Sequence, residues 1–154
     1  MEEITIRSAK REDMDWVNAM YEEIQFKKSC LENEFIVIAK TEGENSGLGR
    51  LVIIDDDNIE LGGIYVLPNY RRLGIAEKIV GHLCQNNPFK NKIIWCLPFE
   101  NLLGFYSKFG FRNVNENYIP EQIMKKYDWC NTNGKYKEKV CILFKKDISL
   151  VLNV

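Results

Sequence analysis

The chain has 154 residues, with 21 Lys and Arg residues against 22 Asp and Glu residues and a formal net charge of −1. This length predicts a single domain over residues 1–154, and the hydrophobic content of 45% supplies a core for it. The balanced charge excludes a general attraction to nucleic acid or to an anionic membrane surface, so we expect neither as a partner.

The cysteines favour a reduced protein without a metal site. Their number is odd and none forms a CxxC pair, which disfavours a zinc site or a secreted disulfide framework. The cysteines are Cys30, Cys84, Cys96, Cys130 and Cys141. The acidic start of the chain is unlike a secretory signal, and no stretch approaches the ~18 apolar residues of a membrane span. We therefore expect a cytoplasmic protein with no bound metal.

The first half of the chain alternates between strand and helix patterns. Residues 3–7 show the two-residue alternation of a strand, and apolar residues from Met14 to Ile24 follow the helical period. The later elements of this half are expected to be a loop or short helix over 27–33, a strand over 35–39, a turn over 41–46 and a strand over 48–54.

The second half continues the mixed pattern. Asp55–Asn58 predicts a hairpin turn rather than a calcium loop, because no EF-hand spacing follows it. The remaining elements are expected to be a strand over 59–66, a helix over 73–84, a buried strand over 93–97, a helix over 100–109 closed by Gly110, a strand over 111–114, a long loop with a short helix over 115–136, and a strand over 138–146. This order predicts an α/β fold, a largely antiparallel sheet flanked by helices.

The segment from Ile64 to Ala76 carries the first chemical signal. A strand ends at Pro68, and a helix begins near Gly74, where unpaired amides and the helix dipole favour an anion. Arg71 and Arg72 add two cations beside this helix start, an arrangement that suits a pyrophosphate. The segment contains neither GxxxxGK[ST] nor GxGxxG, and a surface turn with solvated arginines remains open on this segment alone.

A second segment, residues 102–111, follows one strand and helix later. Here the chain resembles the GCN5-related N-acetyltransferase (GNAT) family. Residues 71–76, Arg-Arg-Leu-Gly-Ile-Ala, match the family pattern Q/R-x-x-G-x-G/A at every fixed position, and 105–111 resemble its later FYxKxGF motif. The resemblance covers about residues 4–144 and is strongest over 60–111. It implies the acyl-CoA N-acyltransferase fold and acetyl-CoA as cosubstrate.

The resemblance also implies the cofactor-binding residues. The main chain of Tyr65 and Val66 is expected to pair with the pantetheine arm, the Val66 amide to polarise the thioester carbonyl, and a bulge at Gly62–Gly63 to open the strand, although a packing role for these glycines is equally open. The pyrophosphate side is expected to comprise Arg71, Arg72, Leu73, Gly74, Ile75 and Ala76. An Asn that many members carry seven residues before the tyrosine is Phe99 here, with Asn101 offset by two.

Tyr106 and Glu60 are the candidate catalytic residues. A phenol of pKa about 10 stays protonated beside a thiol of pKa about 8.5, so Tyr106 is the candidate general acid for the departing thiolate. Glu60 is the candidate base for the amine proton. The alternatives are a packed tyrosine and a solvent-facing or substrate-binding glutamate. His82, the only histidine, is expected on a polar helix face, and Gly47 and Gly49 are expected to shape a strand.

The implied function is acetyl transfer to a primary amine by direct attack in a ternary complex, with a small amine or amino acid as acceptor. Two alternatives stay open: a protein N-terminus or lysine as acceptor, and an acyl-CoA-binding sensor or interaction module without turnover. The acceptor side is expected near residues 21–33 and 115–136. A homodimer is left open.

Overall fold

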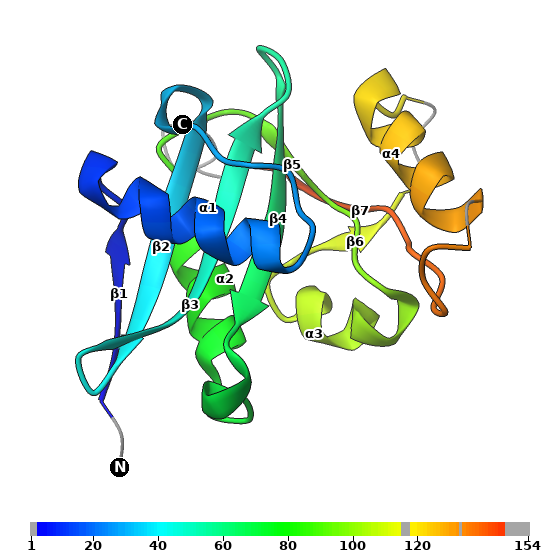
Figure 1. Cartoon of the computed structure of the whole chain (residues 1–154). Helices are drawn as coiled ribbons and strands as arrows, with labels where there is room; N and C mark the ends of the chain where they lie inside the picture. Colours follow the sequence, from blue (N-terminus) through cyan, green and yellow to red (C-terminus); the bar gives the residue numbers. More distant parts are fainter. Residues whose placement is uncertain (1–2, 115–117, 133, 147–154) are drawn as a thin grey trace. The chain divides into compact units, whose positions relative to one another are not determined.

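A computed structural model of the chain describes residues 3–114, 118–132 and 134–146 (Figure 1). Its sheet has seven strands in the order β1-β2-β3-β4-β5-β7-β6. The strands are β1 (Ile4–Ser8), β2 (Glu34–Thr41), β3 (Glu44–Ile53), β4 (Asn58–Val66), β5 (Ile93–Cys96), β6 (Arg112–Asn113) and β7 (Leu143–Lys146). The pairs β1–β2, β2–β3, β5–β7 and β6–β7 are antiparallel. The expected mixed α/β fold with a largely antiparallel sheet is confirmed.

The α-helices are α1 (Met14–Glu23), α2 (Ile75–Gln85), α3 (Leu103–Ser107) and α4 (Glu121–Thr132). Short 3-10 turns lie at Arg11–Asp13, Leu31–Asn33, Pro68–Tyr70 and Glu100–Leu102. The chain divides into two compact units, one made of Met1–Val52 and Leu61–Pro88 and the other of Ile53–Glu60 and Phe89–Val154. The boundary between the two units passes through β4, between Glu60 and Leu61. The expectation that residues 1–154 form a single domain stays a prediction.

In the first unit, α1 and α2 cover opposite faces of the strands (Figure 1). Ile36 and Ile38 of β2 pack with Val17 and Tyr21 of α1 in a fully buried cluster. On the other face, a Cβ atom added at Gly49 would lie 2.6 Å from a methyl group of Ile79 on α2. A side chain at Gly49 would therefore push α2 away from the sheet, so this glycine shapes the strand packing as the sequence predicts.

The second unit is built around Trp95 of β5, Phe144 of β7 and Ile123 of α4. The Trp95 indole nitrogen donates a 2.8 Å hydrogen bond to the Asn58 side chain, which satisfies its one polar group inside the core. The segment 115–136, expected to be a long loop with a short helix, contains the helix α4 over Glu121–Thr132, which is longer than expected. The spacing of Ile123 and Cys130, both buried, is that of one helix face.

Two further differences have local causes. The strand expected over 138–146 is interrupted: Val140 forms an isolated antiparallel bridge with Phe99, and the continuous strand β7 begins at Leu143. The Asn131 side chain hydrogen-bonds the amide and the carbonyl of Val140, at 2.9 and 3.0 Å, so these two groups do not extend the sheet. The helix expected from residue 73 begins at Ile75, because Gly74 has a φ of +79°, which no helical residue adopts.

Candidate active site

The loop between β4 and α2 has an unusual backbone. Arg72 and Gly74 both have positive φ angles, +67° and +79°. Glycine accepts this conformation freely, whereas an arginine adopts it at a cost, and such strain concentrates at functional loops. A Cβ atom added at Gly74 would meet nothing within 4 Å, so the surface above it is open. The backbone here is accessible to a ligand.

The start of α2 supplies unpaired amides at this loop. The first hydrogen bond of the helix runs from the Lys78 amide to the Gly74 carbonyl, at 3.2 Å. The amides of Ile75 and Ala76 precede it and have no carbonyl within the helix to bind. Ile75 anchors the helix start with only 2% of its surface exposed, whereas Leu73 is 40% exposed. The residues therefore fit a diphosphate, which needs several amide donors and a positive dipole end.

Arg71 folds back along the end of β4. Its Nε atom donates a 3.0 Å hydrogen bond to the carbonyl of Val66, and its guanidinium carbon lies 5.9 Å from the centre of the Tyr65 ring. The structure thus brings Tyr65, Val66 and the predicted phosphate loop together in the first unit.

Tyr106, on α3 in the second unit, is 7% exposed. Its ring meets the rings of Phe105 and Phe111 edge to face, with centres 5.0 and 5.8 Å apart. Gly110, at a φ of +91°, turns the chain so that the Phe111 amide reaches the Tyr106 carbonyl at 3.4 Å. The FYxKxGF motif is thus a compact aromatic turn around Tyr106.

Glu60, also in the second unit, has a cation as partner. Its Oε2 atom accepts a hydrogen bond from the Lys126 ammonium on α4 at 2.5 Å. The Glu60 side chain is 14% exposed, and that of Lys126 is 51% exposed. The sequence analysis did not single out Lys126, which lies on α4.

Asn101 lies on the 3-10 turn before α3. Its side-chain nitrogen is 3.5 Å from the Glu138 carboxylate. Phe99, at the position of the family's asparagine, packs edge to face on Tyr136 with ring centres 5.2 Å apart.

A family model described as acetyltransferase (GNAT) family matches residues 3–111. The chain belongs to this family. Solved structures with a similar fold include N-acetylglutamate synthase from Neisseria gonorrhoeae with coenzyme A and L-arginine, at 19% identity and a TM-score of 0.65 over 93% of this chain and 33% of that one. The GNAT chain thus spans about a third of the length of that protein.

Two similar structures match over nearly their whole length. Ribosomal-protein-S18-alanine N-acetyltransferase from Escherichia coli is 17% identical, with a TM-score of 0.66 over 94% of each chain. A GNAT family acetyltransferase from Elizabethkingia anophelis with acetyl-CoA bound is 18% identical, with a TM-score of 0.60 over 93% of this chain and 97% of that one. At these identities the likeness concerns the fold.

A buried cluster that the sequence analysis missed supports β4 of the GNAT chain. Gly63 has a φ of +60°, and its carbonyl accepts a 2.8 Å hydrogen bond from the Tyr21 hydroxyl. The Arg50 guanidinium lies 4.1 Å from the centre of the Tyr21 ring and 3.8 Å from the Glu34 carboxylate. Burial raises the pKa of Tyr21 well above its usual value, so the phenol stays a donor. In the sequence, the Gly62–Gly63 pair within the strand is the feature that could have indicated this cluster.

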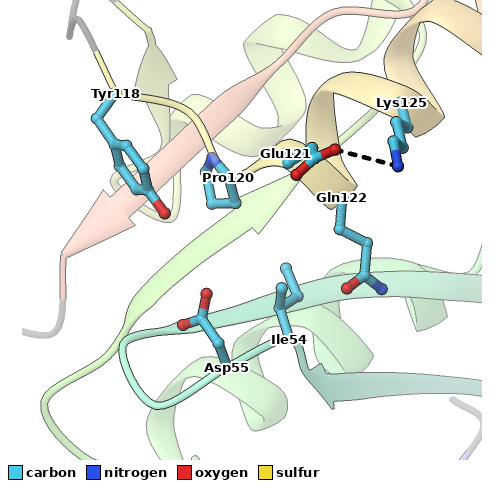
Figure 2. A pocket seen from close by; sticks show the side chains of 7 residues that line it. All are labelled: Ile54, Asp55, Tyr118, Pro120, Glu121, Gln122 and Lys125. Atoms are coloured by element: carbon cyan, nitrogen blue, oxygen red, sulfur yellow. Dashed lines mark ion pairs between the residues drawn. The ribbon is translucent and has the colours of Figure 1, made fainter.

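A cavity of about 420 Å³ lies beside the N-terminus of α4, and Figure 2 shows the side chains that line it. It is lined by Ile54, Asp55, Tyr118, Pro120, Glu121, Gln122 and Lys125. Both of its carboxylates have partners: Glu121 pairs with Lys125 at 3.1 Å, and Asp55 accepts hydrogen bonds from Asn58 and from the Asp57 amide. Neither carboxylate of the cavity is therefore without a partner. The hydrogen bonds that Asp55 accepts stabilise the hairpin turn that the sequence predicts over 55–58.

Within the described ranges, no helix is long and apolar enough to cross a membrane. Over the same ranges, no group of three His, Cys, Asp or Glu side chains is placed to hold a metal ion. His82 lies on α2, where burial lowers its pKa.

Proposed function

We propose that this GNAT chain transfers an acetyl group from acetyl-CoA to a primary amine by direct attack in a ternary complex. The backbone of residues 71–76 carries the proposal, because positive φ angles at Arg72 and Gly74 leave the main chain open directly before the unpaired amides of α2. Two of the similar structures contain coenzyme A or acetyl-CoA, which supports the same cosubstrate here.

The proposed cofactor contacts follow from this backbone. The amides of residues 72–76, with Arg71 and Arg72 beside them, bind the diphosphate. The main chain of Tyr65 and Val66 pairs with the pantetheine arm, and the Val66 amide donates to the thioester oxygen as negative charge develops on it. In this scheme the Arg71 hydrogen bond to the Val66 carbonyl breaks or rearranges when pantetheine binds.

The proposed reaction is a single acyl transfer. The amine nitrogen attacks the thioester carbonyl carbon, the C–N bond forms and the C–S bond breaks. The proton lost by the amine goes to Glu60, directly or through water, and the Tyr106 phenol donates a proton to the departing sulfur. The aromatic packing around the Tyr106 ring supports a fixed orientation for this group.

The proposed acceptor is a small amine or amino acid. The mostly buried carboxylate of Glu60 supports a cationic acceptor. A protein N-terminus or lysine is the second candidate, and the near-complete match to a ribosomal-protein alanine acetyltransferase favours it. The odd number of cysteines and the lack of a CxxC pair support a cytoplasmic location. Calorimetric binding of coenzyme A without thiol release on any acceptor would favour the third reading, a sensor.

The test pairs calorimetry with a thiol-release assay. Wild type is expected to bind coenzyme A and to release thiol from acetyl-CoA with at least one class among amines, amino acids and peptides. Gly74→Glu is expected to abolish binding, because it adds a negative charge to the phosphate loop. Gly43→Glu is the matched control, since Gly43 also has a positive φ, +82°, and open space around its Cβ position. Equal binding by wild type and Gly74→Glu would refute the proposal.

A further inference from the structure

The ion pair between Glu60 and Lys126 joins two groups of unequal mobility. Glu60 lies within β4, and its carboxylate is 14% exposed. Lys126 reaches it from the surface of α4 through a long side chain that is 51% exposed. A mostly buried carboxylate without a cation carries a large desolvation penalty, whereas a half-exposed ammonium can return to water at little cost. The carboxylate is thus a fixed anionic site, and its cation is exchangeable.

The surroundings hold a second ammonium group against aromatic rings. The Lys135 ammonium lies 4.4 Å from the centre of the Trp129 ring and 5.8 Å from that of Tyr136. Cys130, one turn after Lys126, lies close enough for the charges of Glu60, Lys126 and Lys135 to act on its thiol. The Glu60 carboxylate and the Trp129 and Tyr136 rings, each in contact with a lysine ammonium, are groups of the kind that bind alkylammonium ions.

We propose that Glu60 binds the ammonium group of a primary alkylamine acceptor, and that Lys126 holds this position until the acceptor displaces it. The inference rests on the proposed function, in which Glu60 accepts the amine proton. Lys126 Nζ already presents a primary ammonium to the carboxylate at hydrogen-bond distance. An incoming alkylammonium of the same head group can take over that hydrogen bond while Lys126 moves into solvent.

The neighbouring lysine provides an internal control. Lys125 precedes Lys126 on α4 but pairs with Glu121 on the exposed helix surface, with side chains 76% and 82% exposed. Displacement at Glu60 is therefore expected to change the environment of Lys126 and to leave that of Lys125 unchanged.

Binding can be measured without turnover by following the side-chain ammonium signals of ¹⁵N-labelled protein, assigned with Lys126→Arg and Lys125→Arg. Titration with butylammonium chloride is expected to shift the Lys126 signal in a saturable way, whereas sodium chloride at equal ionic strength is not. Absence of a saturable Lys126 shift, or an equal shift at Lys125, would overturn the inference.

Kinetics give the second readout. With butylamine as the probe acceptor, Lys126→Gln is expected to lower the acceptor KM about two- to fivefold, because a half-exposed ion pair no longer competes for Glu60. Lys126→Arg is expected to restore the wild-type KM, and Lys125→Gln to leave it unchanged. A Lys126→Gln enzyme with an unchanged or raised KM would contradict displacement.

The two proposals fail in different ways. Loss of the proposed function would appear as no calorimetric binding of coenzyme A by wild type. Failure of the present inference alone would appear as normal coenzyme A binding together with an unmoved Lys126 signal in the butylammonium titration.

Discussion

The hydroxyl group of Tyr21 on α1 donates a 2.8 Å hydrogen bond to the main-chain carbonyl of Gly63 in β4, 42 residues later in the chain. Gly63 has a φ of +60°, so the strand kinks three residues before Val66. A Cβ atom at Gly63 would lie 2.6 Å from the Tyr21 oxygen, which leaves room for glycine alone. Helix α1 thus fixes the kink in the strand that we propose as the pantetheine platform.

Removal of this hydrogen bond is expected to loosen the platform. Tyr21→Phe leaves the partly buried Gly63 carbonyl without its donor, at a cost of about 1 kcal/mol in the free energy of unfolding. We expect a lower Tm and a higher KM for acetyl-CoA, measured by calorimetry and thiol release. Tyr118→Phe, at a tyrosine that is 61% exposed, serves as the control and is expected to change neither value.

Substitution of Gly63 is expected to be more damaging. Gly63→Ala combines a strained φ with a clash against the Tyr21 hydroxyl, at a cost of about 2–4 kcal/mol. Denaturant unfolding of Gly63→Ala, Tyr21→Phe and the double variant tests the contact. The double variant should lose less than the sum of the two, because removal of the hydroxyl relieves the clash. Additive losses would show that the strain at Gly63 is independent of Tyr21.

Stability at acid pH is expected to depend on Asp13. Hydrogen bonds from Arg7, both at 2.8 Å, hold the pKa of Asp13 well below its usual range, against the opposite effect of burial. A carboxylate with a lowered folded-state pKa adds stability above its unfolded pKa of about 3.9 and loses it as the pH falls towards the folded value. Asp13→Asn should therefore flatten the decline in stability below about pH 4.

Urea unfolding across that pH range measures the effect. Asp15→Asn, at an exposed acidic residue at the start of α1, is the control and should keep the wild-type pH profile. An unchanged acid profile in Asp13→Asn would mean that other carboxylates set the acid limit.

Loss of the Tyr106 hydroxyl group is expected to slow acetyl transfer without weakening the binding of coenzyme A. Tyr106→Phe keeps the ring that packs on Phe105 and Phe111, so coenzyme A affinity and Tm should stay near wild type. Thiol release should fall about a hundredfold, because the departing sulfur loses its proton donor. Full activity in this variant would leave Tyr106 as a packing residue only.

The sequence predicts those parts of the candidate site whose residues are neighbours in the chain. The helix start near Gly74 and the turn around Tyr106 are local, so the sequence patterns predict them, whereas phosphate binding by residues 71–76 stays a prediction. The Tyr21–Gly63 contact joins residues far apart in the chain, and no local pattern encodes it. Helix α4 is longer than the short helix expected from the sequence, because few of its residues are apolar, and because Pro120 was taken to mark a loop when a proline is also common at a helix start.

Helix α4 adds only Ile123 and Cys130 to the protein interior, and it begins after residue 111, where the match to the shared family pattern ends. Apart from these two residues and from Lys126 and Asn131, which bond to Glu60 and Val140, most of its positions can therefore change at little cost to folding. The outward face of α4 can thus carry a different surface while the loop before α2 keeps its structure.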